Sequence, residues 1–169
     1  MRPLTRRGVC AALGAFALRT AIAASARVTP WPSGKPANAL RLTAIDGAVW
    51  DLQSLRGKAV VLHVWASWCE PCRAEMPQLN NLAKSHSELQ ILAINHGEGQ
   101  ASIQRFLSST PVDYPILRDP QGSVLRTWGH GVLPLSILIS RDGRPRFTID
   151  GEFDWDGPEA ARLLRPLLG

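Results

Sequence analysis

The chain has 169 residues, a length that allows one compact domain with a short extension and excludes a two-domain cofactor enzyme. With 45% hydrophobic and 20% charged residues, the composition is that of a globular protein rather than a disordered one. The net charge is +5, but the segment 1–26 holds four arginines and no acid, and without it the charge falls to +1. The charge therefore gives no reason to expect a nucleic-acid partner.

Residues 1–26 have the order of an export signal. Three arginines precede an apolar run over residues 8–18, and the small residues after it offer A-x-A-like cleavage sites within residues 21–26. The run is too short to span a bilayer comfortably. We therefore expect export to the periplasm, through the Sec route or through the twin-arginine route that Arg6-Arg7 suggests. Because Arg19 interrupts the region before cleavage, the alternative is an uncleaved anchor that keeps the protein near the membrane.

The rest of the chain alternates between strand and helix patterns after a leader, residues 27–39, that is rich in proline and small residues. Strands are predicted over residues 40–45, 49–52, 58–66, 89–95, 114–117, 135–140 and 144–149, and helices over 69–84, 102–108, 122–128 and 159–168. Asp-Gly turns predict hairpins at residues 40–52 and 135–149. This order is typical of a single α/β domain over residues 40–169 with a mixed central sheet.

Two cysteines remain beyond the signal, Cys69 and Cys72, in a C-x-x-C pattern. In an oxidising compartment such a close pair can form a disulfide. The closed loop is so small that it constrains the unfolded chain little, which favours a chemical use over a structural one. A zinc site would need two further ligands, and no second pair is present, so no metal is expected.

The segment 65–72, Trp-Ala-Ser-Trp-Cys-Glu-Pro-Cys, resembles the redox motif of the thioredoxin superfamily, in particular its exported TlpA/ResA-like branch. Three further motifs match that branch over residues 37–169: Glu75-Met76-Pro77, Asp119-Pro120-Gln121-Gly122 and Val132-Leu133-Pro134. The resemblance implies a thioredoxin fold with an N-terminal β-hairpin and the branch's central insertion. It also implies a thiol:disulfide oxidoreductase whose redox group is a Cys69–Cys72 disulfide, with no cofactor.

The residues around the cysteines suggest their separate roles. The predicted strand delivers Cys69 to the first turn of a helix, where free N–H groups and the helix dipole stabilise a thiolate. Cys69 would then be the nucleophile, and Cys72, one turn further in, would resolve the mixed disulfide. Pro71 suits an early helical position, because its missing N–H would have had no partner there. Glu70 either weakens the thiolate, which favours a reductant, or is a solvated first-turn carboxylate.

Two further side chains are candidates for proton transfer. Glu75 follows Cys72 by one helical turn and could accept its proton, a role that the resemblance also implies; the alternative is a plain surface residue. His63 precedes Cys69 by six residues and could relay a proton, although the family commonly has Asn there. A hydrogen-bonded core histidine is the other interpretation of His63.

The last candidates concern client binding. Pro134 is expected to form a cis peptide bond that holds the Leu133 backbone beside Cys69, where a client strand can pair with it. Trp65 is expected in the core, whereas Trp68 should cover the cysteines and offer a docking surface.

We therefore expect a monomeric periplasmic reductase of selected protein disulfides, for instance the haem-site cysteines of apocytochrome c. The resemblance implies recharging by a membrane thiol transporter. The alternative is a chaperone for copper-site assembly in cytochrome oxidase, which holds Cu(I) between reduced Cys69 and Cys72 or supplies thiols. Electron transfer is favoured because the only methionines are Met1 and Met76, and no Met/His-rich strip accompanies the cysteines.

Overall fold

The computed structural model describes residues 26–169, so the predicted export signal lies outside the described residues except for Ala26. Within the described part, no helix is both long and apolar enough to cross a membrane.

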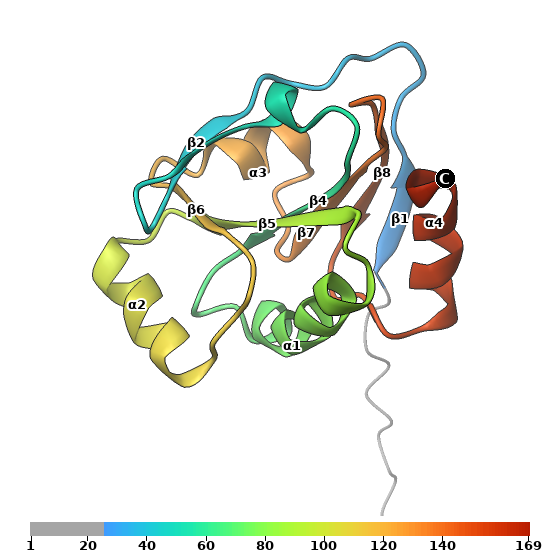
Figure 1. Ribbon diagram of the computed structural model, residues 1–169. Helices are drawn as coiled ribbons and strands as arrows, with labels where there is room; N and C mark the ends of the chain where they lie inside the picture. Colours follow the sequence, from blue (N-terminus) through green and yellow to red (C-terminus); the bar gives the residue numbers. More distant parts are fainter. Residues whose placement is uncertain (1–25) are drawn as a thin grey trace, which may run out of the picture.

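One eight-stranded mixed sheet organises these residues, in the order β1-β8-β7-β4-β5-β6-β2-β3 (Figure 1). The strands are β1 (Arg27–Pro30), β2 (Arg41–Ala44), β3 (Val49–Asp51), β4 (Ala59–Trp65), β5 (Leu89–His96), β6 (Ile116–Asp119), β7 (Leu135–Ile139) and β8 (Pro145–Asp150). The central strands β4, β5 and β6 pair in parallel, and all other pairs are antiparallel. Strand β4 is buried along its whole length, as its nearly continuous apolar sequence predicts.

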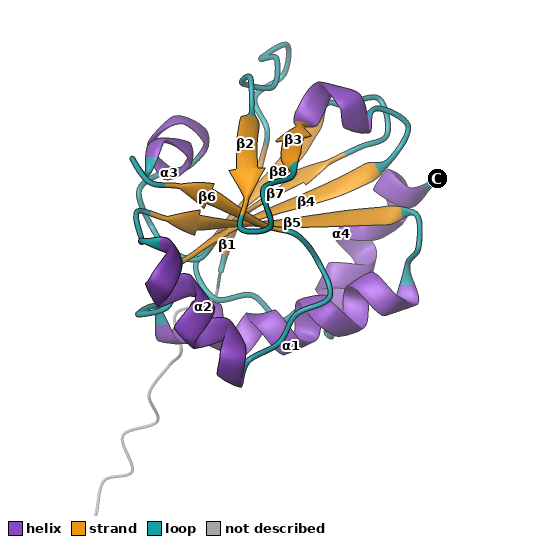
Figure 2. Ribbon diagram, turned by 60° about the vertical axis from the view of Figure 1, so that its left-hand side comes forward, coloured by secondary structure: helices purple, strands orange, loops and turns teal. Residues whose placement is uncertain are grey.

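Helices cover both faces of the sheet (Figure 2). They are the short 3-10 helix η1 (Leu52–Leu55) and the α-helices α1 (Glu70–Ser85), α2 (Gln100–Ser109), α3 (Ser123–Trp128) and α4 (Pro158–Leu168). The buried residues of α1, α2 and α4 share one core with Val61 and Trp65 of β4. Those of α3 share the other core with Val60, Leu62 and Val64, as the alternation of side chains along a strand requires.

The predicted thioredoxin-type fold is confirmed, including the hairpin β2–β3. Helix α2 and strand β6 lie between β5 and α3, where they add a strand to the sheet as the expected insertion. The predicted leader is partly wrong, because residues 27–30 form β1 and pair with β8. That pairing joins the first described strand to the last strand of the chain, so the local pattern could not indicate it. Strand β6 begins two residues later than predicted, after Pro115, which cannot donate a ladder hydrogen bond.

Gly129 ends helix α3 with an ordinary extended backbone, and it lies against Leu135, the fully buried first residue of β7. A Cβ atom at this position would overlap the Leu135 side chain. Gly99 also has an ordinary backbone, but nothing lies within 4 Å of its added Cβ.

We therefore predict that Gly129→Ala lowers the free energy of unfolding by about 1 to 3 kcal/mol, the usual cost of overpacking. Urea denaturation measures this change. The matched variant Gly99→Ala replaces the N-cap of α2, where Ala is less favourable than Gly, and should cost no more than about 1 kcal/mol. Equal stabilities for the two variants would contradict the close approach of Gly129 and Leu135.

Candidate active site

The two cysteines lie where β4 passes into α1. A tight turn follows the strand, in which the Cys69 N–H donates to the Ala66 carbonyl at 3.1 Å. Cys69 then caps the helix, because its Sγ accepts a hydrogen bond from the Cys72 N–H at 3.3 Å. A disulfide joins Cys69 and Cys72. Cys69 is 6% exposed and Cys72 is fully buried, so an incoming thiolate or disulfide can reach only the first sulfur.

The first turn of α1 contains Glu70 and Pro71, the two residues between the cysteines. Pro71 occupies one of the first positions of the helix, where its missing N–H costs no hydrogen bond. Glu70 is exposed and pairs with Arg73, one turn on, at 3.2 Å. This position favours the interpretation of Glu70 as a solvated first-turn carboxylate, because solvent and the Arg73 charge both screen it.

Glu75 is a buried carboxylate rather than a surface residue, with 2% of its area exposed. Its Oε1 accepts from the Phe153 N–H at 2.8 Å, and its Oε2 accepts from the Trp155 Nε1–H at 2.7 Å. Burial raises the pKa of Glu75 to about 7; the two hydrogen bonds oppose this rise, and the charge of Glu152 adds to it. Near neutral pH, therefore, Glu75 can both take up and release a proton.

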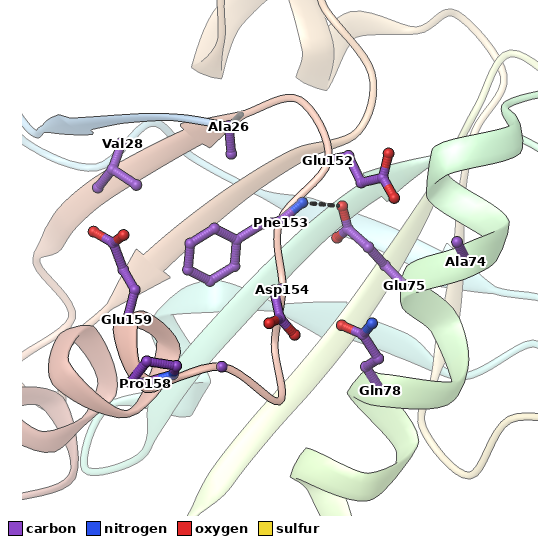
Figure 3. A pocket seen from close by; sticks show the side chains of 11 residues that line it. Ala26, Val28, Ala74, Glu75, Gln78, Glu152, Phe153, Asp154, Pro158 and Glu159 are labelled. Carbon is purple, nitrogen blue, oxygen red and sulfur yellow. Dashed lines mark hydrogen bonds between the residues drawn. The ribbon is translucent and has the colours of Figure 1, made fainter. Parts of the chain in front are cut away.

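A cavity of about 470 Å³ lies beside Glu75 (Figure 3). Helix α1 supplies Glu75 and Gln78 to its wall, and the segment between β8 and α4 supplies Glu152, Phe153 and Asp154. In Figure 3 the Glu75 carboxylate points at the Phe153 backbone along the cavity wall. The cavity gives the buried carboxylate a short route to solvent for proton exchange.

His63 lies under the same site on β4 and is completely buried. Its Nδ1 is 3.0 Å from the Ser136 Oγ and 3.7 Å from the Glu75 Oε2. Burial lowers the pKa of His63 to about 3, so the ring is neutral and forms no ion pair with Glu75 despite the short distance. The contact with Glu75 is also too long for a hydrogen bond. The geometry favours the hydrogen-bonded core histidine over the proton relay.

The Leu133–Pro134 peptide bond is cis, and the Pro134 carbonyl accepts from the Gly151 N–H at 2.9 Å. Half-buried Leu133 packs against the core that contains both cysteines. Trp68 and Val132 are exposed apolar residues, with 68% and 48% of their areas accessible. Trp65, as expected, is buried, and its ring lies 5.0 Å from that of Phe106.

Sequence reasoning missed Phe153, Trp155 and Ser136, the partners of Glu75 and His63. These contacts join residues 73 to 80 positions apart. No local spacing marks them, although an isolated Trp in a polar loop before the last helix is a weak signal of a buried anchor.

Glu75 should make stability depend on pH. The folded protein keeps this proton up to about pH 7, whereas the unfolded chain releases it near pH 4.5. The folded state therefore binds more protons in this window, and stability falls as pH rises. We predict that the oxidised wild type loses about 2 kcal/mol more between pH 5 and pH 8 than Glu75→Gln, which has no proton to release.

Urea denaturation at several pH values tests this prediction. As the pH falls below 6.5, the free energy of unfolding of both proteins should decrease through His63, because this histidine is neutral in the folded state and becomes charged in the unfolded chain. Identical slopes for the two proteins between pH 5 and pH 8 would show that the buried carboxylate titrates normally.

Comparison with solved structures agrees with this geometry. A Chlorobium tepidum protein assigned as the thiol:disulfide interchange protein DsbE is 29% identical, with a TM-score of 0.74 over 80% of this chain and 97% of that one. A secreted Mycobacterium tuberculosis disulfide oxidoreductase, described as homologous to E. coli DsbE, is 25% identical, with a TM-score of 0.66 over 76% of this chain and 96% of that one.

Sequence comparison is more specific. The Redoxin family model matches residues 32–164. The thiol-disulfide oxidoreductase ResA of Bacillus thuringiensis (strain Al Hakam) is 34% identical over 121 residues, which are 70% of each chain. ResA of Bacillus subtilis (strain 168) is 34% identical over 101 residues, 59% of this chain and 56% of that one. With a C-x-x-C disulfide at a helix N-terminus, the chain belongs to the Redoxin family and is a thiol-disulfide oxidoreductase of the ResA type.

Proposed function

We propose that this oxidoreductase works in the periplasm as a reductase of selected protein disulfides, such as the haem-site disulfide of an apocytochrome c. The observation that carries the proposal is the buried Glu75, one turn beyond Cys72, with a pKa of about 7. A reductase must deprotonate its buried second thiol during each turnover, and Glu75 is a base tuned for that step at neutral pH.

The reaction begins with the reduced pair. The Cys69 thiolate attacks one sulfur of the client disulfide; a mixed disulfide forms, and the other client sulfur leaves as a thiolate that takes a proton from solvent. Cys72 then gives its proton to Glu75 and attacks Cys69. The Cys69–Cys72 disulfide forms as the bond between Cys69 and the client breaks, and the second client sulfur leaves as a thiolate that takes a proton from solvent. Glu75 then returns its proton to solvent, and two electrons have passed to the client. A membrane thiol transporter would return the oxidised pair to the dithiol.

Client selection in this proposal uses the surface beside the disulfide. An extended client segment would pair with the Leu133 backbone, which the cis bond to Pro134 orients. The exposed Trp68 and Val132 would contact apolar client side chains. Export is supported by the order of residues 1–26 and by the secreted Mycobacterium tuberculosis relative.

In disulfide exchange the two sulfurs have different roles: Cys69 attacks the client and Cys72 resolves the mixed disulfide. We predict that Cys72→Ser still attacks a client and stalls as a mixed disulfide, whereas Cys69→Ser forms none. The measurement is a non-reducing gel of periplasmic extracts from cells that express each variant, with bands that collapse on adding dithiothreitol. Identification of a c-type apocytochrome among the trapped proteins would support the proposed client.

If the protein instead bound Cu(I), loss of either cysteine should weaken binding equally, because a two-coordinate thiolate site loses most of its affinity when either ligand is removed. A Cu(I) competition titration of the reduced wild type belongs beside the gel. If Cys72→Ser traps no partner, and the wild type binds Cu(I) tightly without reducing any disulfide, the copper chaperone replaces the reductase.

The role of Glu75 predicts a pH profile. The resolving step should speed up as pH rises through about 7 in the wild type, because only the ionised carboxylate accepts the Cys72 proton. In Glu75→Gln the step should slow by on the order of 100-fold and lose this inflection. The measurement is stopped-flow mixing of each reduced protein with a large excess of a disulfide substrate, which makes attack fast and leaves the decay of the transient mixed disulfide as the observed step. Glu70→Gln, an exposed carboxylate on the same helix, is the matched control and should keep the wild-type profile.

A further inference from the structure

A carboxylate outside the redox motif holds the turn that carries Cys69. Glu98, between β5 and α2, accepts two hydrogen bonds from Ser67: one from the backbone N–H at 2.7 Å and one from Oγ at 2.5 Å. Ser67 lies in the turn 66–69, two residues before Cys69. Both groups of Ser67 that can donate a hydrogen bond are thus directed at one side chain on a different loop.

The other end of this contact is anchored in the sheet. Asn95 of β5 is 1% exposed and donates from Nδ2 to the Glu98 Oε2 at 2.8 Å, and its Oδ1 accepts from the Glu98 N–H at 3.3 Å. Asn95 is the register partner of Trp65, the last residue of β4. Asn95, Glu98 and Ser67 therefore form a clamp across the carboxyl ends of the two central parallel strands.

Two features set this clamp apart from an ordinary surface contact. It uses no atom of either cysteine, so opening the disulfide removes none of its hydrogen bonds. Glu98 is also charged: burial opposes ionisation, but the hydrogen bonds from Ser67 and Asn95 outweigh it and hold the pKa of Glu98 below its usual value. Ser67 and Cys69 belong to one tight turn, so their Cα atoms lie less than about 7 Å apart. The Glu98 carboxylate, which is hydrogen-bonded to Ser67, therefore lies within about 10 Å of Cys69.

We propose that Glu98 is a positioning residue for Cys69, which fixes the turn 66–69 against β5 in both redox states and places a negative charge near the attacking sulfur. The first effect keeps the sulfur aligned for attack, since misplacement of about 1 Å costs rate heavily. The second makes the thiolate less stable, which keeps the dithiol reducing. The other titratable and charged groups around this turn are Glu70 and Arg73 on α1, the buried Glu75 further along that helix, and His96 at the end of β5, whose charge also lowers the pKa of Glu98.

Two substitutions separate position from charge. In Glu98→Gln, the amide oxygen can accept from the Ser67 N–H and Asn95, and the amide nitrogen can donate to the Ser67 Oγ, so the clamp survives without its charge. Glu98→Ala removes both. Glu88→Gln, an exposed glutamate paired with His86, is the matched control for the change in net charge.

The experiment measures three quantities on each reduced variant: the rate of attack on insulin disulfides, the pKa of the Cys69 thiol from the pH dependence of alkylation, and the equilibrium with glutathione. We expect Glu98→Ala to attack at least about tenfold more slowly. Glu98→Gln should stay within about twofold of the wild-type rate, with the thiol pKa lowered by about 0.3 and the glutathione equilibrium shifted toward the dithiol.

A merely structural clamp would leave the thiol pKa and the glutathione equilibrium of Glu98→Gln at the values of Glu88→Gln, and that result overturns the role of the charge. An attack rate for folded Glu98→Ala within twofold of the wild type overturns the role in positioning. If Glu98→Ala does not fold, the attack rate of Ser67→Ala, which loses the Oγ hydrogen bond to Glu98, decides the role in positioning in its place. None of these readouts depends on the physiological client or direction, so they stand apart from the proposed reductase role.

Discussion

Burial of strand β4 between β5 and β7 is the feature from which the site is built. Both faces of β4 are covered by hydrophobic cores, which fix the position of its carboxyl end. From this fixed end the chain continues through the turn 66–69 directly into α1. The helix then presents free N–H groups to Cys69 and carries Cys72 into the interior. The difference in access between the two sulfurs thus follows from a buried strand running into a capped helix.

The same burial tunes the chemistry. Glu75 lies one turn inside α1, where desolvation favours its neutral form. Hydrogen bonds from the Phe153 N–H and the Trp155 Nε1–H replace part of the lost hydration and favour the ionised form. His63, beneath it on β4, is neutral for the same reason. One carboxylate that titrates near neutral pH lies beside one imidazole that does not, and this difference supports the proposed transfer of the Cys72 proton to Glu75 rather than to His63.

The parallel strands bring a second loop to the site. Parallel neighbours end at the same edge of a sheet, so the segment after β5 meets the segment after β4. In the segment after β5, Glu98 accepts a hydrogen bond from Ser67 in the segment after β4. On the other side of β4 lies its antiparallel neighbour β7, which begins directly after the cis Leu133–Pro134 peptide bond. The redox turn is therefore flanked by loops from both neighbours of its own strand, which suits a sulfur that must keep one position through repeated oxidation and reduction.

Local sequence was enough to predict the order of strands and helices from residue 40 onward, the deeper position of Cys72 relative to Cys69, and the positions of Glu75 and Pro134, because each depends on short-range periodicity or on a contiguous motif. What these residues contact depended on long-range packing. Packing added β1 to the sheet, buried Glu75 against Phe153 and Trp155, and joined Glu98 to Ser67. Such contacts link segments that are far apart along the chain, and their desolvation and hydrogen bonding exist only once those distant elements pack together.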